Sequence, residues 1–275
     1  MIKPILVALS VILLVPNFID KNINDHTAYN LKEKFVPSLS YINSIDKLEA
    51  HTDSLAATKN IPQQTADYYT LLESIVSDRF YHGFSQYTLK ENWVAAVSQR
   101  VIGYGLDNKV LPADIMKNEM AACSQQTAVM MAIAKKKKTN YRSVGFPHHY
   151  AMEVEEKGYW YFLDANMEPS ISTNQRRLRN WRAQNDSLKK YYNAHIYSTL
   201  NYQFGVNQKA SFGALNGNPA PRLKLFHIVT LLLSKLLWCI PLILLFVKIK
   251  SKAGFKKSPK PGFNAANDLH PLLSV

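Results

Sequence analysis

Near its C-terminus the chain contains 23 consecutive residues, Leu225 to Val247, in which almost every side chain is apolar. About 20 apolar residues are enough for a helix to cross the hydrocarbon core of a bilayer, so residues 225–247 predict a transmembrane helix. Lys235 lies near the middle of this run and Pro241 interrupts it. A lysine inside a membrane segment usually faces a partner or water. The alternative, a buried helix of a soluble protein, stays open.

A second apolar stretch lies at the N-terminus, where Lys3 is followed by the run 5–16. A basic start and a short apolar region are typical of a secretory signal. Residues 17–20 lack the small-residue pattern that marks a cleavage site. Residues 1–19 are therefore predicted to be a signal peptide or a signal anchor, with cleavage undecided.

The net charge of +13 would suit nucleic acid binding, but the positions of the charges indicate a membrane instead. No basic face interleaved with stacking aromatics recurs along the chain, so nucleic acid is not an expected partner. The tail 248–275 begins with six lysines and fits anionic lipid headgroups. The positive-inside rule places this tail in the cytoplasm and the region between the apolar segments outside the cytoplasmic membrane. The lysines are Lys248, Lys250, Lys252, Lys256, Lys257 and Lys260.

Between the two apolar segments the chain has the hydrophobic content of a folded domain. Residues 20–60 are polar and weakly patterned, which predicts a linker or peripheral segment. The domain itself is expected at 61–211, and the Gly, Asn and Pro-rich residues 212–224 predict a second linker. Two stretches within the domain, 66–80 and 91–105, repeat apolar residues at helical spacing, and both apolar stripes are expected to face a core.

A helix is predicted to begin at or just before Cys123, with Val129, Met130 and Ile133 turned to the core. Three runs rich in aromatic and β-branched residues follow and predict strands. The order of one helix and three strands, joined to the earlier helices, predicts an α+β fold. The predicted strands are 142–146, 149–154 and 159–164.

Cys123 is the one cysteine outside the apolar segments, because Cys239 lies in the C-terminal run. No disulfide framework is available, so Cys123 is either an inert buried thiol or a reactive one. The N-terminus of a helix favours a thiolate, because its unpaired N–H groups and its dipole attract negative charge. A nucleophilic thiolate also needs an imidazole beside it and a third group that orients the imidazole.

The last two strands can supply both of these groups. A turn at residues 156–157 or 155–158 makes paired positions sum to 313, which sets His149 directly opposite Asp164 on one sheet face. His149, Ala151 and Glu153 would share that face, and Met152 would belong to the opposite, core-facing set. His148 points to the other face, so the two neighbouring histidines are unlikely ligands of one metal ion, and no metal site is predicted.

These residues resemble the transglutaminase-like cysteine enzymes, a branch of the papain-like superfamily. Cys123 opens a helix, His149 begins the run HYAMEV, and Asp164 ends the run WYFLD, as in that family. The resemblance covers about residues 115–170. It implies a papain-like core, in which the nucleophile helix packs on a small antiparallel sheet, with added helices and the C-terminal transmembrane helix.

The resemblance also implies acyl transfer at a peptide or carboxamide carbonyl by the triad Cys123, His149 and Asp164. The expected substrate is a peptide or protein, and no cofactor is required. The sequence departs from the family at Ala122, where glycine is common, and in having no Gly-Ile pair before Arg142. The Cys123 backbone N–H is one expected oxyanion donor, and the second is open among Asn92, Trp93 and Asn118. The alternative function is a catalytically silent module that binds a protein or surface polymer at the membrane.

Overall fold

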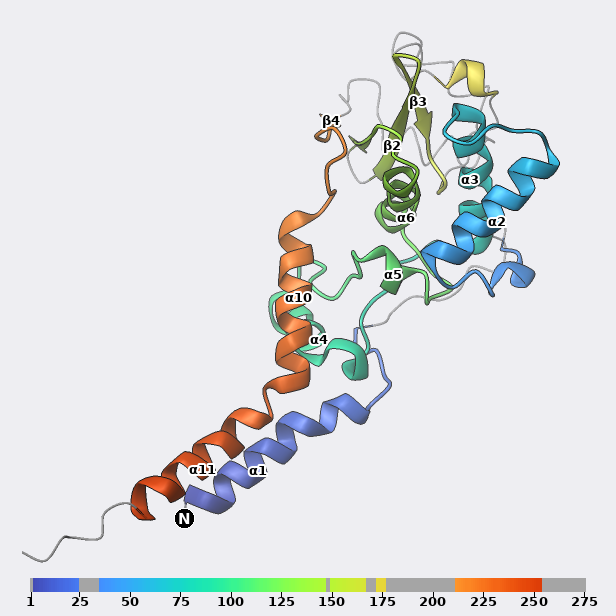
Figure 1. Cartoon of the computed structure of the whole chain (residues 1–275). Helices are drawn as coiled ribbons and strands as arrows, with labels where there is room; N and C mark the ends of the chain where they lie inside the picture. The colour runs from blue at the N-terminus through green and yellow to red at the C-terminus, as the bar shows by residue number, and fades with distance from the viewer. Residues whose placement is uncertain (1, 25–34, 147–148, 167–171, 177–210, 254–275) are drawn as a thin grey trace, which may run out of the picture. The chain divides into compact units, whose positions relative to one another are not determined.

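The computed structural model describes residues 2–24, 35–146, 149–166, 172–176 and 211–253 (Figure 1). The chain divides into two compact units. The larger one, here called the globular unit, is Val15–Lys235, and the smaller one, the helix-pair unit, combines Met1–Leu14 with Leu236–Val275. His148, all of residues 177–210 and the tail from residue 254 onward lie outside the described residues.

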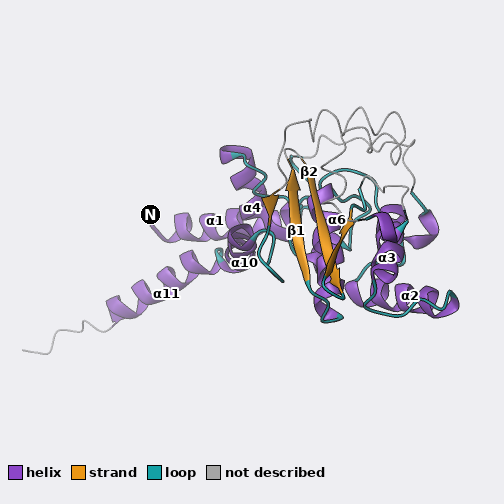
Figure 2. Cartoon of the chain, turned by 90° about the horizontal axis from the view of Figure 1, so that it is seen from above, coloured by secondary structure: helices purple, strands orange, loops and turns teal. Residues whose placement is uncertain are grey.

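The globular unit is α+β, as predicted, and contains a small antiparallel sheet in the order β3-β2-β1-β4. Helices α3 and α6 lie together on one side of this sheet (Figure 2). Its short 3-10 helices are η1 (Val15–Phe18), η2 (Pro37–Leu39) and η3 (Thr173–Gln175). Its helices are α2 (Ile45–Thr58), α3 (Ala66–Arg79), α4 (Leu89–Ile102), α5 (Pro112–Ile115), α6 (Cys123–Lys136) and α10 (Pro221–Leu236). Its strands are β1 (Tyr141–Phe146), β2 (His149–Glu156), β3 (Tyr159–Leu163) and β4 (Ser211–Phe212).

The core lies between α3, α6 and the sheet, and it uses the apolar positions that the helical spacing predicted. In α3 these are Tyr69, Leu72, Ile75 and Val76, and all four are buried. The three predicted core residues of α6 are also buried, as are Met152 and Val154 of β2. Burial of these side chains is the main favourable contribution to the stability of the unit. The α6 members are Val129, Met130 and Ile133.

The predicted pairing of β2 with β3 was wrong by two residues. The pairs observed, such as Met152 with Leu163, sum to 315. The turn therefore consists of Lys157 and Gly158, whose φ angles of 51° and 79° are both left-handed. A two-residue hairpin turn with both φ angles positive matches the twist of the strands, and glycine adopts such an angle without strain.

A shift of two residues leaves every side chain on its predicted face, because side chains alternate with a period of two. Asp164 follows the last residue of β3, where the register sets it opposite Ala151 instead of His149. His149 is then the diagonal neighbour of Asp164 on the same face, which is still within reach of a long side chain.

Residues 211–216 continue along the free side of β1. Gly213 and Asn216 donate their N–H groups to Ser143 O and Tyr141 O, at 2.9 and 2.8 Å. Arg142 of β1 forms an ion pair with Glu153, and its guanidinium group lies 4.2 Å from the rings of both Trp160 and Phe212. The first part of the predicted linker 212–224 is thus hydrogen-bonded to the sheet.

The prediction that the apolar stripe of α4 faces a core was wrong. The buried residues of α4 are Asn92, Ala95 and Ala96. The larger apolar side chains near its C-terminal end are exposed instead. Their exposed fractions are 41% for Val97, 78% for Val101, 60% for Ile102 and 93% for Tyr104. Helical spacing shows that a stripe exists, but it does not show what covers it.

The long C-terminal apolar run is divided between α10, which ends at Leu236, and α11 (Cys239–Ala253). Among the described residues no single helix is both long and apolar enough to cross a membrane, and only this broken pair passes such a test together. Pro241 accounts for the break. A proline has no N–H to donate and its ring clashes with the carbonyl four residues earlier, which here is that of Leu237.

One side of α10 is polar and packs within the globular unit. Ser234 Oγ donates to Asn92 Oδ1 at 2.9 Å, and Asn92 Nδ2 donates to Thr230 Oγ1 at 3.0 Å. Lys235, which was expected to need a partner, donates from Nζ to Lys90 O at 2.6 Å and to Asn17 Oδ1 at 3.1 Å. Satisfying these groups with protein partners avoids the cost of leaving polar atoms unpaired in an apolar environment.

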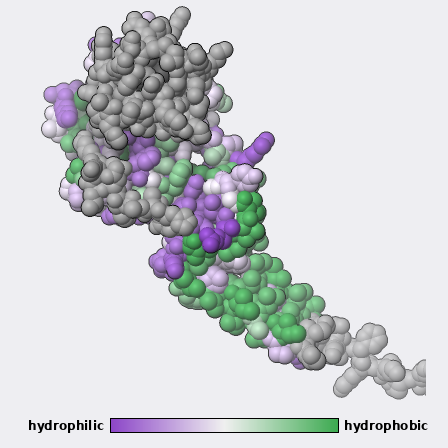
Figure 3. Space-filling model, turned by 180° about the vertical axis from the view of Figure 1, so that it is seen from behind, coloured by the Kyte–Doolittle hydropathy of each residue, from purple (hydrophilic) through white to green (hydrophobic). Residues whose placement is uncertain are grey.

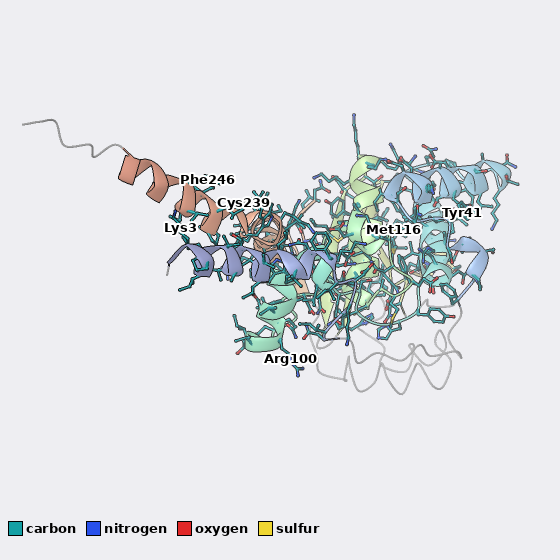
Figure 4. All side chains as sticks on the ribbon, turned by 90° about the horizontal axis from the view of Figure 1, so that it is seen from below. Lys3, Tyr41, Arg100, Met116, Cys239 and Phe246 are labelled. Atoms are coloured by element: carbon teal, nitrogen blue, oxygen red, sulfur yellow. The ribbon has the colours of Figure 1, made fainter. Side chains whose placement is uncertain are left out.

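The helix-pair unit consists of α1 (Ile2–Leu14) and α11, which lie side by side and antiparallel (Figures 1 and 4). Ser10 Oγ donates to Trp238 O at 2.8 Å between the two segments. Most of the other side chains are apolar, and many are exposed, including Ile12 and Phe246 at 66% and 64%. Apolar residues accordingly cover the visible surface of this unit (Figure 3).

Candidate active site

Cys123 is the first residue of α6 and is partly exposed. The start of α6 is fixed by Gln125, whose Oε1 accepts the N–H groups of Ala122 and Ser85 at 3.1 and 2.8 Å. Its Nε2 donates to Ser85 O and Lys109 O at 2.8 and 2.7 Å. A buried amide with all of these partners is rigid. The thiol is therefore held at a helix N-terminus, where negative charge is favoured.

His149 begins β2, and Asp164 follows β3. His149 Nε2 and Asp164 Oδ2 are 2.8 Å apart, and both side chains are 1% exposed. The Cys123 thiol lies close enough to the same imidazole to contribute to the raised pKa of His149. The structure thus brings the three predicted residues together in the order thiol, imidazole and carboxylate.

The surroundings of His149 strongly favour the protonated ring. Burial alone lowers the pKa of His149, but the charge and hydrogen bond of Asp164, together with Cys123, outweigh it and raise the pKa to about 10. An imidazolium ion beside a thiol stabilises the thiolate by direct attraction. The geometry and the charges therefore suit a thiolate–imidazolium pair, the active form of a nucleophilic cysteine.

Sequence reasoning missed a buried ion pair behind Asp164. Glu73 of α3 accepts the backbone N–H of Asp164 on Oε1 at 2.5 Å, and its Oε2 lies 2.6 Å from Arg176 Nη1. Arg176 also holds β3, because it accepts the N–H of Phe162 on its carbonyl at 2.6 Å and donates from Nη1 to Phe162 O at 3.3 Å. These contacts fix the end of β3 at which Asp164 is located.

Glu73 is 1% exposed, and burial raises its pKa to about 7 against the opposing effects of Arg176 and the Asp164 N–H. A sequence signal for this residue existed. Glu73 follows Leu72 directly and precedes Ile75 and Val76 within the apolar pattern of α3. A carboxylate in such a pattern has to find a cation or a hydrogen-bond donor inside the protein.

The three side chains considered as second oxyanion donors all donate elsewhere. Asn92 Nδ2 donates to Thr230, Trp93 Nε1 donates to Ser234 O at 3.0 Å, and Asn118 Nδ2 donates to Asp114 O at 2.7 Å. Within the described part of the chain, no three His, Cys, Asp or Glu residues are grouped so that they could hold a metal ion.

Neither protein family models, curated proteins nor solved structures give a match to this chain. The candidate site therefore rests on the positions of its residues in this structure. Three residues separated by 26 and 15 positions in the sequence converge from the start of a helix and the ends of two strands.

Proposed function

We propose that this protein is a membrane-anchored cysteine enzyme of the transglutaminase-like type, with a papain-like catalytic core outside the cytoplasmic membrane. The observation that carries the proposal is the contact of His149 with both Cys123 and Asp164. A buried histidine that served only the core would need one partner. Here one imidazole lies between a helix-terminal thiol and a carboxylate, which is the arrangement of a nucleophilic triad.

The proposed reaction is acyl transfer from a peptide or carboxamide. Cys123 Sγ attacks the carbonyl carbon, the C=O electron pair moves to oxygen, and the Cys123 backbone N–H at the start of α6 stabilises the oxyanion. His149 then gives its proton to the leaving amine as the C–N bond breaks, which leaves a thioester on Cys123. Attack by water or a second amine, deprotonated by His149, releases the product and restores the thiol.

Each triad residue has a distinct part in this reaction. Asp164 holds the ring of His149 in place and stabilises its protonated form, as the raised pKa of His149 indicates. Glu73 does not reach the reacting atoms through any contact described, and its part is to position Asp164. Hydrolysis and transfer to an amine share every step up to the thioester, so both remain within the proposal.

Membrane attachment is the second half of the proposal. It is supported by the exposed apolar side chains of α1 and α11 and by the lysines at both chain ends. Lys3 lies at the same end of the helix pair as Phe246, close to where the lysine-rich sequence begins (Figure 4). Basic residues flanking apolar helices interact favourably with anionic headgroups.

The decisive experiment labels membranes that contain the full chain with an electrophilic glutamine or peptide analogue. Replacing Cys239 with serine leaves Cys123 as the single thiol. We expect labelling of the Cys239→Ser chain and its loss in Cys123→Ala and His149→Ala. Folding of each variant is checked by circular dichroism.

Absence of labelling in a folded Cys239→Ser chain would contradict the enzyme proposal. It would favour the silent module that binds a protein or surface polymer. His148→Ala provides the matched histidine control, because His149 is the histidine that contacts Asp164. Its labelling should stay within about tenfold of the parent chain, or about 1.4 kcal/mol of barrier.

A further inference from the structure

The exposed apolar end of α4 is a surface that the proposed chemistry does not use. Val97 and Val101 are four residues apart on α4, Ile102 is its last residue, and Tyr104 follows the C-cap Gly103. All four are exposed, as described above. A row of large apolar side chains open to water on one helix is unusual for a soluble surface and marks a contact site.

Helix α10 carries a second exposed apolar face next to α4. The Leu106 carbonyl, two residues after Tyr104, lies 2.9 Å from His227 Nε2 of α10. His227 itself is buried, whereas Leu225 and Ile228 on either side of it are 63% and 42% exposed. The face continues along α10 to the end of that helix. Its further exposed members are Val229, Leu231, Leu232, Leu233 and Leu236.

The charges around these two faces are almost all positive. From Trp93 to Leu106 there is no acidic residue, and α10 has none either. Arg100 lies on the outer surface of α4 (Figure 4), and Arg222 and Lys224 lie exposed at the start of α10. Near the other end of α4, Asp20 faces Lys90 at 3.6 Å and Glu91 pairs with Lys109 at 2.8 Å.

We infer that Val97, Val101 and Ile102 of α4 and Tyr104 just after it, with the exposed face of α10, form a surface on the globular unit that contacts an anionic phospholipid bilayer. Apolar side chains, an amphipathic aromatic residue and flanking cations without acids are the composition of interfacial lipid-binding helices. Continuity of sequence supports lipid as the occupant, since the apolar face of α10 leads directly into the apolar residues of α11. The inference rests on the proposed membrane attachment and is independent of the proposed enzyme activity.

The test places a fluorescent reporter on this surface in the full chain. In a Cys123→Ser, Cys239→Ser background, Val101→Cys is labelled with a polarity-sensitive dye. The protein is then reconstituted in vesicles of phosphatidylcholine and phosphatidylglycerol with and without nitroxide-bearing lipid. Tyr104→Cys is the second reporter. Tyr159→Cys is the matched control, because Tyr159 is 51% exposed on the hairpin of the sheet.

We expect blue-shifted emission and quenching by nitroxide lipid at positions 101 and 104, several-fold stronger than at position 159. Quenching no greater than at position 159 would overturn the inference. A blue shift without lipid quenching would also overturn it and would indicate a second copy or another protein as the occupant. Flotation separates the two proposals. If the chain does not float with vesicles, membrane attachment fails, whereas flotation without quenching at 101 and 104 overturns this inference alone.

Discussion

His149 determines how the site should respond to pH. If the imidazole were neutral, it would place no positive charge beside the thiol or the carboxylate. The buried carboxylate of Asp164, 2.8 Å away, instead raises the pKa of His149 to about 10, so the ring stays charged through the neutral range. The imidazolium then keeps a full positive charge beside the Cys123 thiol throughout that range.

The first prediction concerns iodoacetamide alkylation of Cys123 in the Cys239→Ser chain. We expect Cys123 to be alkylated at pH 6.5, and Asp164→Asn to slow that alkylation. Asp164 raises the pKa of His149, so without it the ring loses its proton at lower pH and the thiolate loses its counterion. The rate at pH 6.5 should fall at least about tenfold, which corresponds to one pH unit. Superimposable pH curves for the two chains would show that the imidazolium does not activate the thiol.

The second prediction concerns the ion pair behind Asp164. In Glu73→Gln the amide oxygen can still accept the Asp164 N–H, but the guanidinium of Arg176 loses its carboxylate. Breaking one partner of a buried ion pair typically costs about 3–5 kcal/mol. We expect a large drop in the free energy of unfolding, measured by denaturant titration of the full chain in detergent at about pH 9, where Glu73, with a pKa of about 7, is ionised. Glu73→Gln with Arg176→Met removes both charges and should recover a substantial part of that loss. Equal stability of Glu73→Gln and the parent would contradict a charged pair.

The positions of the helices and strands around the site follow from local sequence patterns, whereas the way they pair does not. Apolar spacing in α3 and α6 predicted their core faces because burial enforces that spacing. The β2–β3 register was wrong because both assumed turns were centred on Glu156 and Lys157, whereas the observed turn is Lys157 and Gly158; the period of two still kept His149 and Asp164 on one face. Glu73 was missed because its partner Arg176 lies 103 residues away in the sequence.

The third prediction tests the turn that sets this register. A methyl group added at Gly158 would meet no atom within 4 Å, so the cost of Gly158→Ala comes from its φ of 79° alone. An L-residue in the left-handed region costs about 1–2 kcal/mol. We expect Gly158→Ala to lower the free energy of unfolding by about that amount, and Lys157→Gly to raise it slightly, since Lys157 already has a φ of 51°. Gly213→Ala is not a suitable control because its added methyl would lie against Ser143.

At the scale of the whole chain, the sequence predicts two apolar segments, but not that they pack against each other. The first ends near residue 18 and the second begins near residue 221, and no local pattern reports on a contact over such a separation. The structure groups α1 and α11 in one unit and assigns α10 to the other. This division agrees with the side chains of the two helices. Helix α10 has buried His227, Thr230 and Ser234, which need polar partners, whereas residues 240–247 of α11 have no polar side chain.

The last prediction concerns topology. Because α1 packs on α11 and residues 19 and 21 accept hydrogen bonds from Lys90 and Leu89 in the globular unit, we expect the N-terminal segment to be retained in the mature protein. Lys3 lies at the same end of the helix pair as Phe246 (Figure 4), and the lysine-rich sequence follows Val247, so the positive-inside rule places both basic segments on the cytoplasmic side and residues 20–222 outside. The apolar helix Lys3–Phe18 is about 24 Å long at 1.5 Å per residue, slightly shorter than a hydrocarbon core of about 30 Å. A modest local thinning of the bilayer would therefore be needed.

A membrane-impermeant maleimide applied to intact cells tests this topology, using Lys3→Cys, Lys248→Cys and Tyr159→Cys, each in the Cys123→Ser, Cys239→Ser background. Only position 159 should react before the cells are opened, and all three should react afterwards. Loss of residue 3 from the purified chain by mass spectrometry would show that the N-terminal segment is cleaved. Reaction of all three positions from outside would show instead that the helix pair rests in the outer leaflet without crossing, because the short apolar length then governs insertion more strongly than the lysines do.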